Sequence, residues 1–343
     1  MARIIGYNSD LFCKEDTYSL KGLCMLMIII HHLFQWTSSR YGVSYPLPAS
    51  ILLQISGNFG SAIFLLISGY GLSLSLWKKK QTFSDTLRRL SKLYFPFVFF
   101  WVIGCIILLI DDSLNLRRNL LGLIRFDLPV VGGGKWFIVS IFFLYVLMIF
   151  LSWILKDKRK IVISVLLLVT VYIVIQIFII KSSQPWYNTL ISFPVGVLCA
   201  CYKEKLQQIK KKNVGWILFI IFLFSFFLTQ MCGTSHYWPT RNAYIYSPIL
   251  MNLTSLSFAL MAVIFTSVIN IKCGLFSYIG VHSYTFFMGH LVLVTFAGRI
   301  QNVYAYIIFV LGGTFGLAYM YSVIQQIPQY LKARNIPNNY HTQ

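Results

Sequence analysis

Apolar runs of about twenty residues recur from one end of the chain to the other. A run of that length crosses the hydrocarbon core of a bilayer as a helix, and runs without polar alternation exclude a strand barrel. The composition agrees, because 57% of the 343 residues are hydrophobic, 11% are charged and mean hydropathy is +0.72. We therefore expect an all-α polytopic membrane bundle of about ten spans, at 18–36, 50–76, 93–110, 136–155, 161–180, 187–202, 214–231, 247–269, 276–298 and 303–327.

The net charge of +20 would suit a nucleic-acid-binding protein, but the basic residues lie in short clusters between the apolar runs. Clusters in such places usually face the cytoplasm and its anionic headgroups. With the N-terminus inside, most of the 29 Lys and Arg fall in inner segments. This bias predicts cytoplasmic tails at 1–17 and 328–343 around a membrane domain at 18–327, with the bilayer and not nucleic acid as the partner.

The first run carries ionisable side chains that an anchor would not need. On a helix, Lys21 and His32 share one face and lie 11 residues, or roughly 16 Å, apart. His31 points about 100° away from that face. Ionisable groups at membrane depth are costly, so His32 is a candidate functional residue. The alternative is that His32 only hydrogen-bonds a neighbouring helix.

The second run contains small and hydroxyl-bearing residues at helical spacing, among them Ser61 and Ser68, with Tyr70 nearby. A face of small residues allows another helix to approach closely. The same side chains could instead line a narrow polar passage. Both interpretations remain open from the sequence.

A basic cluster of Arg88, Arg89 and Lys92 stands on one helical turn just before the third run. Such a cluster usually lies among headgroups and sets the topology. It could equally hold phosphates, which arginine binds through two parallel hydrogen bonds.

A second membrane histidine, His290, follows Ser283 by seven residues and so shares its helical face. The predicted topology places His290 in the outer half of the bilayer, as it does His32, and the two imidazoles could line one cavity. Hydrogen bonding between helices is again the alternative. Any carboxylate that orients His32 would come from the outer loop 111–135, which carries Asp111 and Asp127.

The seven cysteines show no metal-ligand spacing, so no metal site is expected.

Five motifs occur in an order typical of one family of membrane enzymes. They are Lys21-Gly22 with His32 eleven residues after Lys21, Phe64 with Ser68-Gly69-Tyr70, Arg89 and Lys92 before Pro96, Trp136-Phe137, and Ser283-Tyr284 before His290. In this order the chain resembles the acyltransferase-3 family over nearly its whole length. The family's usual arginines are replaced by Lys21 and Lys92, and its usual Tyr-Leu before the last histidine reads Met288-Gly289.

The resemblance implies transfer of an acyl group, usually acetyl, from cytoplasmic acyl-CoA to a sugar hydroxyl of a cell-surface polysaccharide or lipid-linked glycan. It also implies a multi-pass protein of a bacterial plasma membrane, with acyl-CoA as a co-substrate and no resident cofactor. His32 would be the general base or would accept the acyl group itself. Phosphates of CoA would be held by Lys21, Arg88, Arg89 and Lys92, and the developing oxyanion would be stabilised by Ser68, Tyr70 or His290.

A second class of function uses the same features. A transporter that exports a glycan or a small organic acid could place His32 and His290 along its pathway. Transporters usually show inverted repeats and broken helices in matching halves, and this chain shows neither pattern. The sequence therefore favours the acyltransferase. It does not indicate an oligomeric state.

Overall fold

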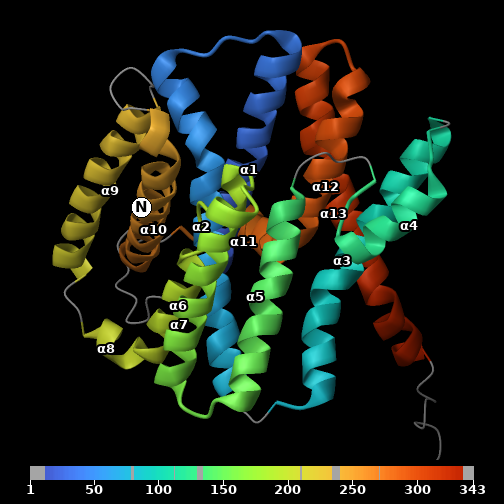
Figure 1. The fold of residues 1–343 in the computed structure, drawn as a ribbon. Helices are drawn as coiled ribbons and strands as arrows, with labels where there is room; N and C mark the ends of the chain where they lie inside the picture. The colour runs from blue at the N-terminus through green and yellow to red at the C-terminus, as the bar shows by residue number, and fades with distance from the viewer. Residues whose placement is uncertain are drawn as a thin grey trace, which may run out of the picture. The chain divides into compact units, whose positions relative to one another are not determined.

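The computed structural model describes residues 12–78, 81–111, 113–129, 134–208, 211–233, 240–269 and 271–334. The named regular elements in these ranges are all helices, which confirms the all-α prediction. The chain divides into two compact parts (Figure 1). The first part comprises 1–93 and 132–281, and the second comprises 94–131 and 282–343.

The first part contains most of the long helices. They are α1 (Lys14–Tyr41), α2 (Leu47–Trp77), the start of α3 (Phe83–Ile110), α5 (Lys135–Ile154), α6 (Lys158–Val174), α7 (Ser192–Cys201), α8 (Lys203–Gln207), α9 (Lys211–Gly233), α10 (Thr240–Val268) and α11 (Gly274–Val281). A short π-helix, η1 (Ile175–Ile179), continues α6, and a 3-10 turn, η2 (Gln184–Trp186), precedes α7. Helices α1 and α2, drawn in blue in Figure 1, pack side by side.

The second part contains the remainder of α3, the short helix α4 (Leu116–Arg125), α12 (Ser283–Phe296), the 3-10 turn η3 (Ala297–Arg299) and α13 (Val303–Arg334). Asn115 caps α4, because its side chain accepts a hydrogen bond from the amide of Arg118 (3.0 Å). Helices α12 and α13 pack together, and Tyr306 lies fully buried between them and donates to the carbonyl of Val294 (3.3 Å).

Eight helices of the described residues are long and apolar enough to cross a membrane, or nine if α11 and α12 form one broken span. The difference between the ten expected spans and the eight long helices comes from the sixth and the ninth span. The sixth is reduced to the ten-residue α7, which begins two residues before Pro194 and so places this proline in its first turn, where proline costs least. The ninth is interrupted at His282, where a turn separates α11 from α12.

In the first part, glycines allow the backbones of two helix pairs to come into direct contact. A Cβ added to Gly69 of α2 would lie 2.2 Å from the carbonyl oxygen of Phe193, and one added to Gly196 of α7 would lie 2.1 Å from that of Leu66. The contact joins α2 to α7 through Gly69, which lies about 100° around the helix from Ser68 and therefore outside the face of Ser61 and Ser68 considered above.

Helices α1 and α11 meet in the same way. A Cβ on Gly22 would lie 2.0 Å from the carbonyl oxygen of Phe276, and the hydroxyls of Ser19 and Ser277 are hydrogen-bonded at 2.9 Å. Before α11, the ammonium of Lys272 lies 2.6 Å from the carboxylate of Glu15, and this hydrogen-bonded ion pair raises the pKa of Lys272.

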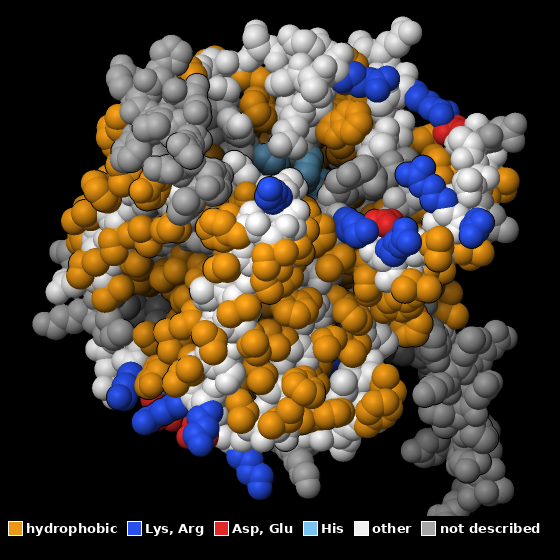
Figure 2. Space-filling model, viewed as in Figure 1, with side chains coloured by type: hydrophobic (Ala, Val, Ile, Leu, Met, Phe, Trp, Pro, Cys, Tyr) orange, Lys and Arg blue, Asp and Glu red, His pale blue; other side chains and the backbone are white. Residues whose placement is uncertain are grey.

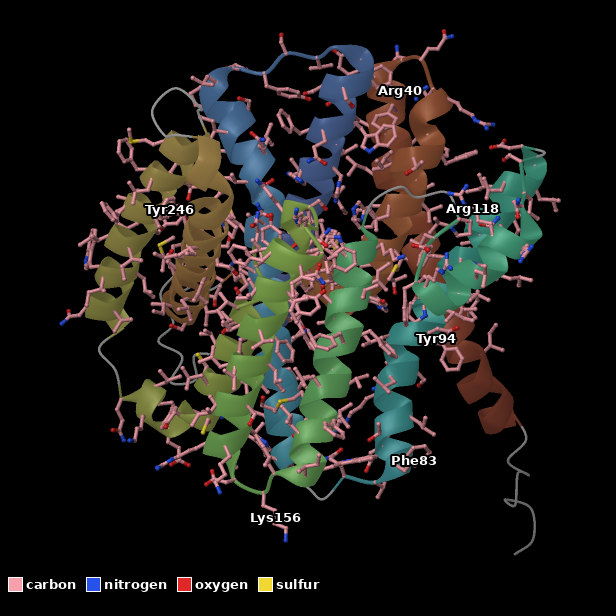
Figure 3. The ribbon with its side chains drawn as sticks, in the orientation of Figure 1. Arg40, Phe83, Tyr94, Arg118, Lys156 and Tyr246 are labelled. Carbon is pink, nitrogen blue, oxygen red and sulfur yellow. The ribbon has the colours of Figure 1, made fainter. Side chains whose placement is uncertain are left out.

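Large apolar side chains are exposed along the outer helices of the first part, as Phe150 of α5, Leu167 of α6 and Ile220 of α9 illustrate. Figure 2 shows hydrophobic side chains over much of the face drawn, with Lys and Arg along its lower edge. Figure 3 labels Lys156 and Arg40 at opposite ends of the first part. An apolar band between charged ends is what a bilayer requires, and the chain is a multi-pass membrane protein.

The close contact at Gly69 predicts a site-specific loss of stability. Gly69→Ala inserts a methyl group against a backbone carbonyl that cannot move aside, and we expect it to destabilise the protein by about 1–3 kcal/mol. Gly71→Ala on the same helix is the control, because a Cβ there meets no atom within 4 Å. Thermal unfolding of both variants in detergent measures the difference. Equal midpoints for the two variants would contradict the α2–α7 contact.

Candidate functional site

Helix α1 is continuous through both of its predicted site residues, Lys21 and His32. Their separation of roughly 16 Å along the axis therefore holds. Both side chains are half-buried. The neighbouring His31, which the sequence left without a role, donates through Nδ1 to the carbonyl of Leu53 on α2 (2.9 Å), and its ring lies edge-on to that of His32 (5.2 Å between centroids).

Gly57 of α2 makes room for this arrangement, since a Cβ there would lie 2.6 Å from the His31 ring. His31 thus fixes α1 against α2, and the His32 ring is positioned beside it. His31 makes an interhelical hydrogen bond of the kind that was considered for His32.

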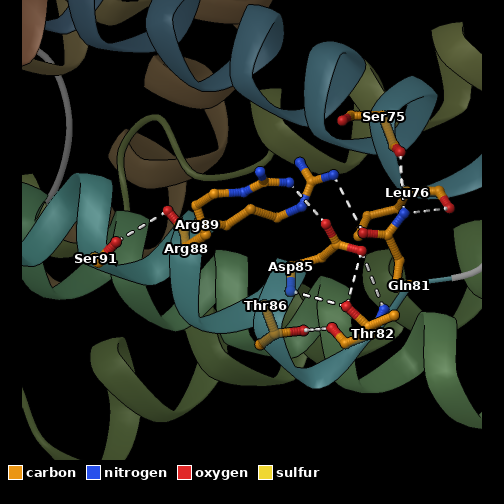
Figure 4. A network of polar contacts seen from close by, with 9 residues as sticks. All are labelled: Ser75, Leu76, Gln81, Thr82, Asp85, Thr86, Arg88, Arg89 and Ser91. Carbon is orange, nitrogen blue, oxygen red and sulfur yellow. Dashed lines mark hydrogen bonds and ion pairs between the residues drawn. The ribbon is translucent and has the colours of Figure 1, made fainter. Parts of the chain in front are cut away.

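A capping box starts α3 and sets the direction of its basic side chains. The amide and hydroxyl of Thr82 donate to the carboxylate of Asp85 (3.3 and 3.0 Å), and the amide of Asp85 donates back to the Thr82 hydroxyl (3.1 Å). Arg88 then donates to the other oxygen of Asp85 (2.7 Å) and stays exposed (Figure 4). The charge of Arg88 is therefore already partly neutralised.

Arg89 is held differently, by the end of α2. Its Nη2 donates to the side-chain oxygen of Gln81 (3.2 Å), and the amide nitrogen of Gln81 donates to the carbonyls of Ser75 and Leu76 (3.3 and 3.4 Å; Figure 4). The Nε of Arg89 is buried and has no hydrogen-bond partner among the described residues. Arg89 thus retains donor capacity for an anionic ligand.

Tyr145 of α5 connects this arginine to the second predicted motif. Its phenol lies beside the hydroxyl of Ser68 and within electrostatic reach of Arg89. On the same pair of helices, Phe64 lies against Phe137 with ring centroids 6.4 Å apart. Side chains from three helices, Ser68 of α2, Arg89 of α3 and Tyr145 of α5, therefore form one polar centre of the first part.

Sequence reasoning missed Tyr145, which stands alone in an apolar run. The available signal was its hydroxyl, because a tyrosine in a membrane interior requires a hydrogen-bond partner.

The remaining predicted residues are more dispersed. Tyr70 is buried in a cluster with Cys199 and Ala200, with the Phe12 ring stacked on it at 3.9 Å. Lys92 is exposed on α3.

His290 lies in the second part and is fully buried on α12. Its Nδ1 donates to the carbonyl of Phe286 one turn earlier (3.1 Å), and its ring lies against Phe287. Just after α3, both carboxylate oxygens of Asp111 are bound by the guanidinium of Arg299. The described residues include no group of three or more His, Cys, Asp or Glu side chains arranged to hold a metal ion.

The family model described as an acyltransferase domain matches residues 19–323. The chain belongs to the acyltransferase-3 family. The match covers every residue that was predicted for the site, and it identifies this membrane protein as an acyltransferase. No curated protein and no solved structure was found to match.

The polar centre of this acyltransferase can be tested with a double-mutant cycle. Tyr145→Phe and Ser68→Ala each remove one of two neighbouring hydroxyls, so we expect their effects on stability to be less than additive, with a coupling of about 0.6 kcal/mol or more. Thermal unfolding of the two single variants and the double variant in detergent gives the coupling. Fully additive effects would show that Ser68 and Tyr145 do not interact.

Proposed function

We propose that this acyltransferase transfers an acyl group, acetyl in the simplest case, from cytoplasmic acyl-CoA to a sugar hydroxyl of a cell-surface or exported glycan, in a bacterial plasma membrane. The observation that carries the proposal is the polar centre around Arg89. There a guanidinium with unused donors is fixed beside the Ser68–Tyr145 pair by Gln81. A phosphate is the ligand to which such a guanidinium is best suited.

In this proposal the basic residues contribute to CoA binding in different ways. Arg89 would bind a phosphate from a fixed position, whereas Arg88 and Lys92, both exposed, would add charge at the inner surface. Lys21 would meet the donor at the start of α1. The pantetheine arm of CoA has a length of the same order as the roughly 16 Å from Lys21 to His32. A donor anchored at the inner surface would therefore present its thioester at the depth of His32.

In the proposed reaction the imidazole of His32 acts as the base. His32 would take the proton of the acceptor hydroxyl while the hydroxyl oxygen attacks the thioester carbonyl. The resulting oxyanion would be stabilised by hydroxyl donors, for which Ser68 and Tyr70 are the candidates. Collapse of the tetrahedral intermediate would break the carbon–sulfur bond, and the proton on His32 would pass to the departing thiolate. In a second route the acyl group would rest on His32 before it reaches the sugar.

The role of His32 is tested by His32→Ala. General-base catalysis contributes about 10²–10⁴ in rate, so we expect O-acylation of the surface glycan, measured by mass spectrometry, to fall at least a hundredfold. Gln35→Ala, one turn further along the same face, is the control and should retain activity. Normal O-acylation by His32→Ala at normal protein level would refute the assignment.

The role of Arg89 is tested by binding. Arg89→Gln removes a charged donor that Gln81 already positions, and we expect about a tenfold weaker affinity for CoA in titration calorimetry of the purified protein. Arg159→Gln, in the first turn of α6, is the matched control and should bind as the unmodified protein does. Equal affinity of Arg89→Gln and the control would remove Arg89 from the donor site.

A further inference from the structure

Helix α4 of the second part turns a small, polar side toward the rest of the protein. Trp101 of α3 donates through its indole nitrogen to the carbonyl of Asn119 (3.1 Å), and Asn119 is only 7% exposed. Gly122, one turn later, is also buried, and a Cβ there would lie 2.9 Å from the carbonyl oxygen of Asp127. The side of α4 that packs on α3 therefore contains no large apolar residue at these contacts.

The other side of α4 is apolar and exposed. It carries Leu120, Leu121 and Ile124, which we call the apolar face of α4, and Ile124 is 78% exposed. At 100° per residue, Ile124 points about 140° away from Asn119. An apolar face that met only water would forgo the stabilisation that burial provides. Its partner is therefore expected to be apolar.

The packing of α4 indicates that this partner is the bilayer. Helix α3 is itself long and apolar enough to cross a membrane, and its side chains Val102 and Ile106 are exposed. Trp101 lies nine residues before Ile110 at the end of α3, which is roughly 14 Å along the axis. Because Trp101 holds Asn119, α4 returns beside the membrane-spanning part of α3. Lipid that reaches α3 at this level also reaches α4.

Three arginines accompany the apolar face. Arg118 and Arg125 are seven residues apart, so they lie within about 20° of one line on the helix, and Arg117 stands in the first turn. All three are exposed, and the ion pairs within the described part of the chain include none of them. Leu120 and Ile124 lie on a line about 130° from that of the two arginines. A helix with one cationic and one apolar side is typical of the membrane surface.

The arginines favour an anionic headgroup over a zwitterionic one. A guanidinium binds phosphate through two parallel hydrogen bonds, and its long side chain can reach the headgroups from the edge of the hydrocarbon. In a zwitterionic lipid the ammonium offsets the phosphate charge, whereas an anionic lipid attracts each nearby cation. The sequence also predicts this segment on the outer side, where Lys and Arg are usually few. Binding to anionic lipid gives a physical reason for three arginines there.

We propose that α4 is an interfacial helix that binds anionic phospholipids. Its apolar face lies in the hydrocarbon, and Arg117, Arg118 and Arg125 bind the headgroup phosphates. The bound lipid holds α4 at the membrane surface, and α4 in turn holds the end of α3 through Trp101. This inference does not depend on the proposed acyl transfer, because none of these residues is assigned to the donor or the acceptor.

The test is photo-cross-linking of the purified full-length protein in nanodiscs of phosphatidylcholine. Two probes are compared, phosphatidylglycerol and phosphatidylcholine with the same diazirine-bearing acyl chain, and the labelled peptides are identified by mass spectrometry. We expect both probes to label α4, because its apolar face contacts any lipid. The phosphatidylglycerol probe should label it about tenfold more strongly at equal concentration. Unlabelled phosphatidylglycerol should compete, and high salt should weaken the preference.

Variants separate the two parts of the surface. Arg118→Gln combined with Arg125→Gln should abolish the preference for phosphatidylglycerol and retain the labelling itself. The matched control combines Arg40→Gln with Arg159→Gln, which removes two exposed arginines elsewhere and the same net charge, and should keep the preference. Ile124→Ser should lower the labelling of α4 by both probes. All of these side chains are exposed, so the variants should fold as the unmodified protein does.

Three results would overturn the proposal. If neither probe labels α4 while the exposed side of α9 is labelled, lipid does not reach α4, and a second copy of the chain or a glycan covers it instead. Equal labelling of α4 by the two probes would mean that the arginines do not select an anionic headgroup. A preference that survives Arg118→Gln with Arg125→Gln would place the selectivity elsewhere in the protein.

Discussion

The structure depends on how buried polar groups find hydrogen-bond partners where no water is available. A hydrocarbon environment offers neither donor nor acceptor, so each buried amide, hydroxyl or guanidinium must find its partner within the protein. Tyr145 lies beside Ser68 and within electrostatic reach of Arg89, and together these side chains join α2, α3 and α5, while the Nε of Arg89 has no partner among the described residues. The polar centre is therefore a structural junction as well as a candidate ligand site, and function and folding there depend on the same side chains.

The hydrocarbon of the bilayer also determines how the helices pack against one another. Between apolar helices in lipid there is little hydrophobic force, and association depends on close contact and on interhelical hydrogen bonds. The pairs α1–α11 and α2–α7 achieve this contact through Gly22 and Gly69, where one backbone rests on another. His31 adds the hydrogen bond that fixes α1 on α2, so His32 beside it is held by a rigid neighbour.

Much of this was readable from the sequence, and the exceptions have physical causes. Apolar runs predicted the long helices because length and hydropathy alone decide whether a segment can cross a bilayer. The breaks at Pro194 and His282 shortened two of them, and only the first has a local signal. The proximity of Ser68 and Arg89 could be anticipated only from family resemblance, since helix periodicity shows which residues share a face but not which faces meet. Tyr145 carries no motif.

The capping box of α3 has a consequence for how this family can vary. Gln81 and Thr82 tie the end of α2 to the first turn of α3, so the rotation of α3 about its axis is set by the number of residues between the two helices. One inserted residue would turn Arg89 by about 100° and carry its guanidinium away from Tyr145. Substitutions in this connection should thus be tolerated in natural relatives far more often than insertions or deletions.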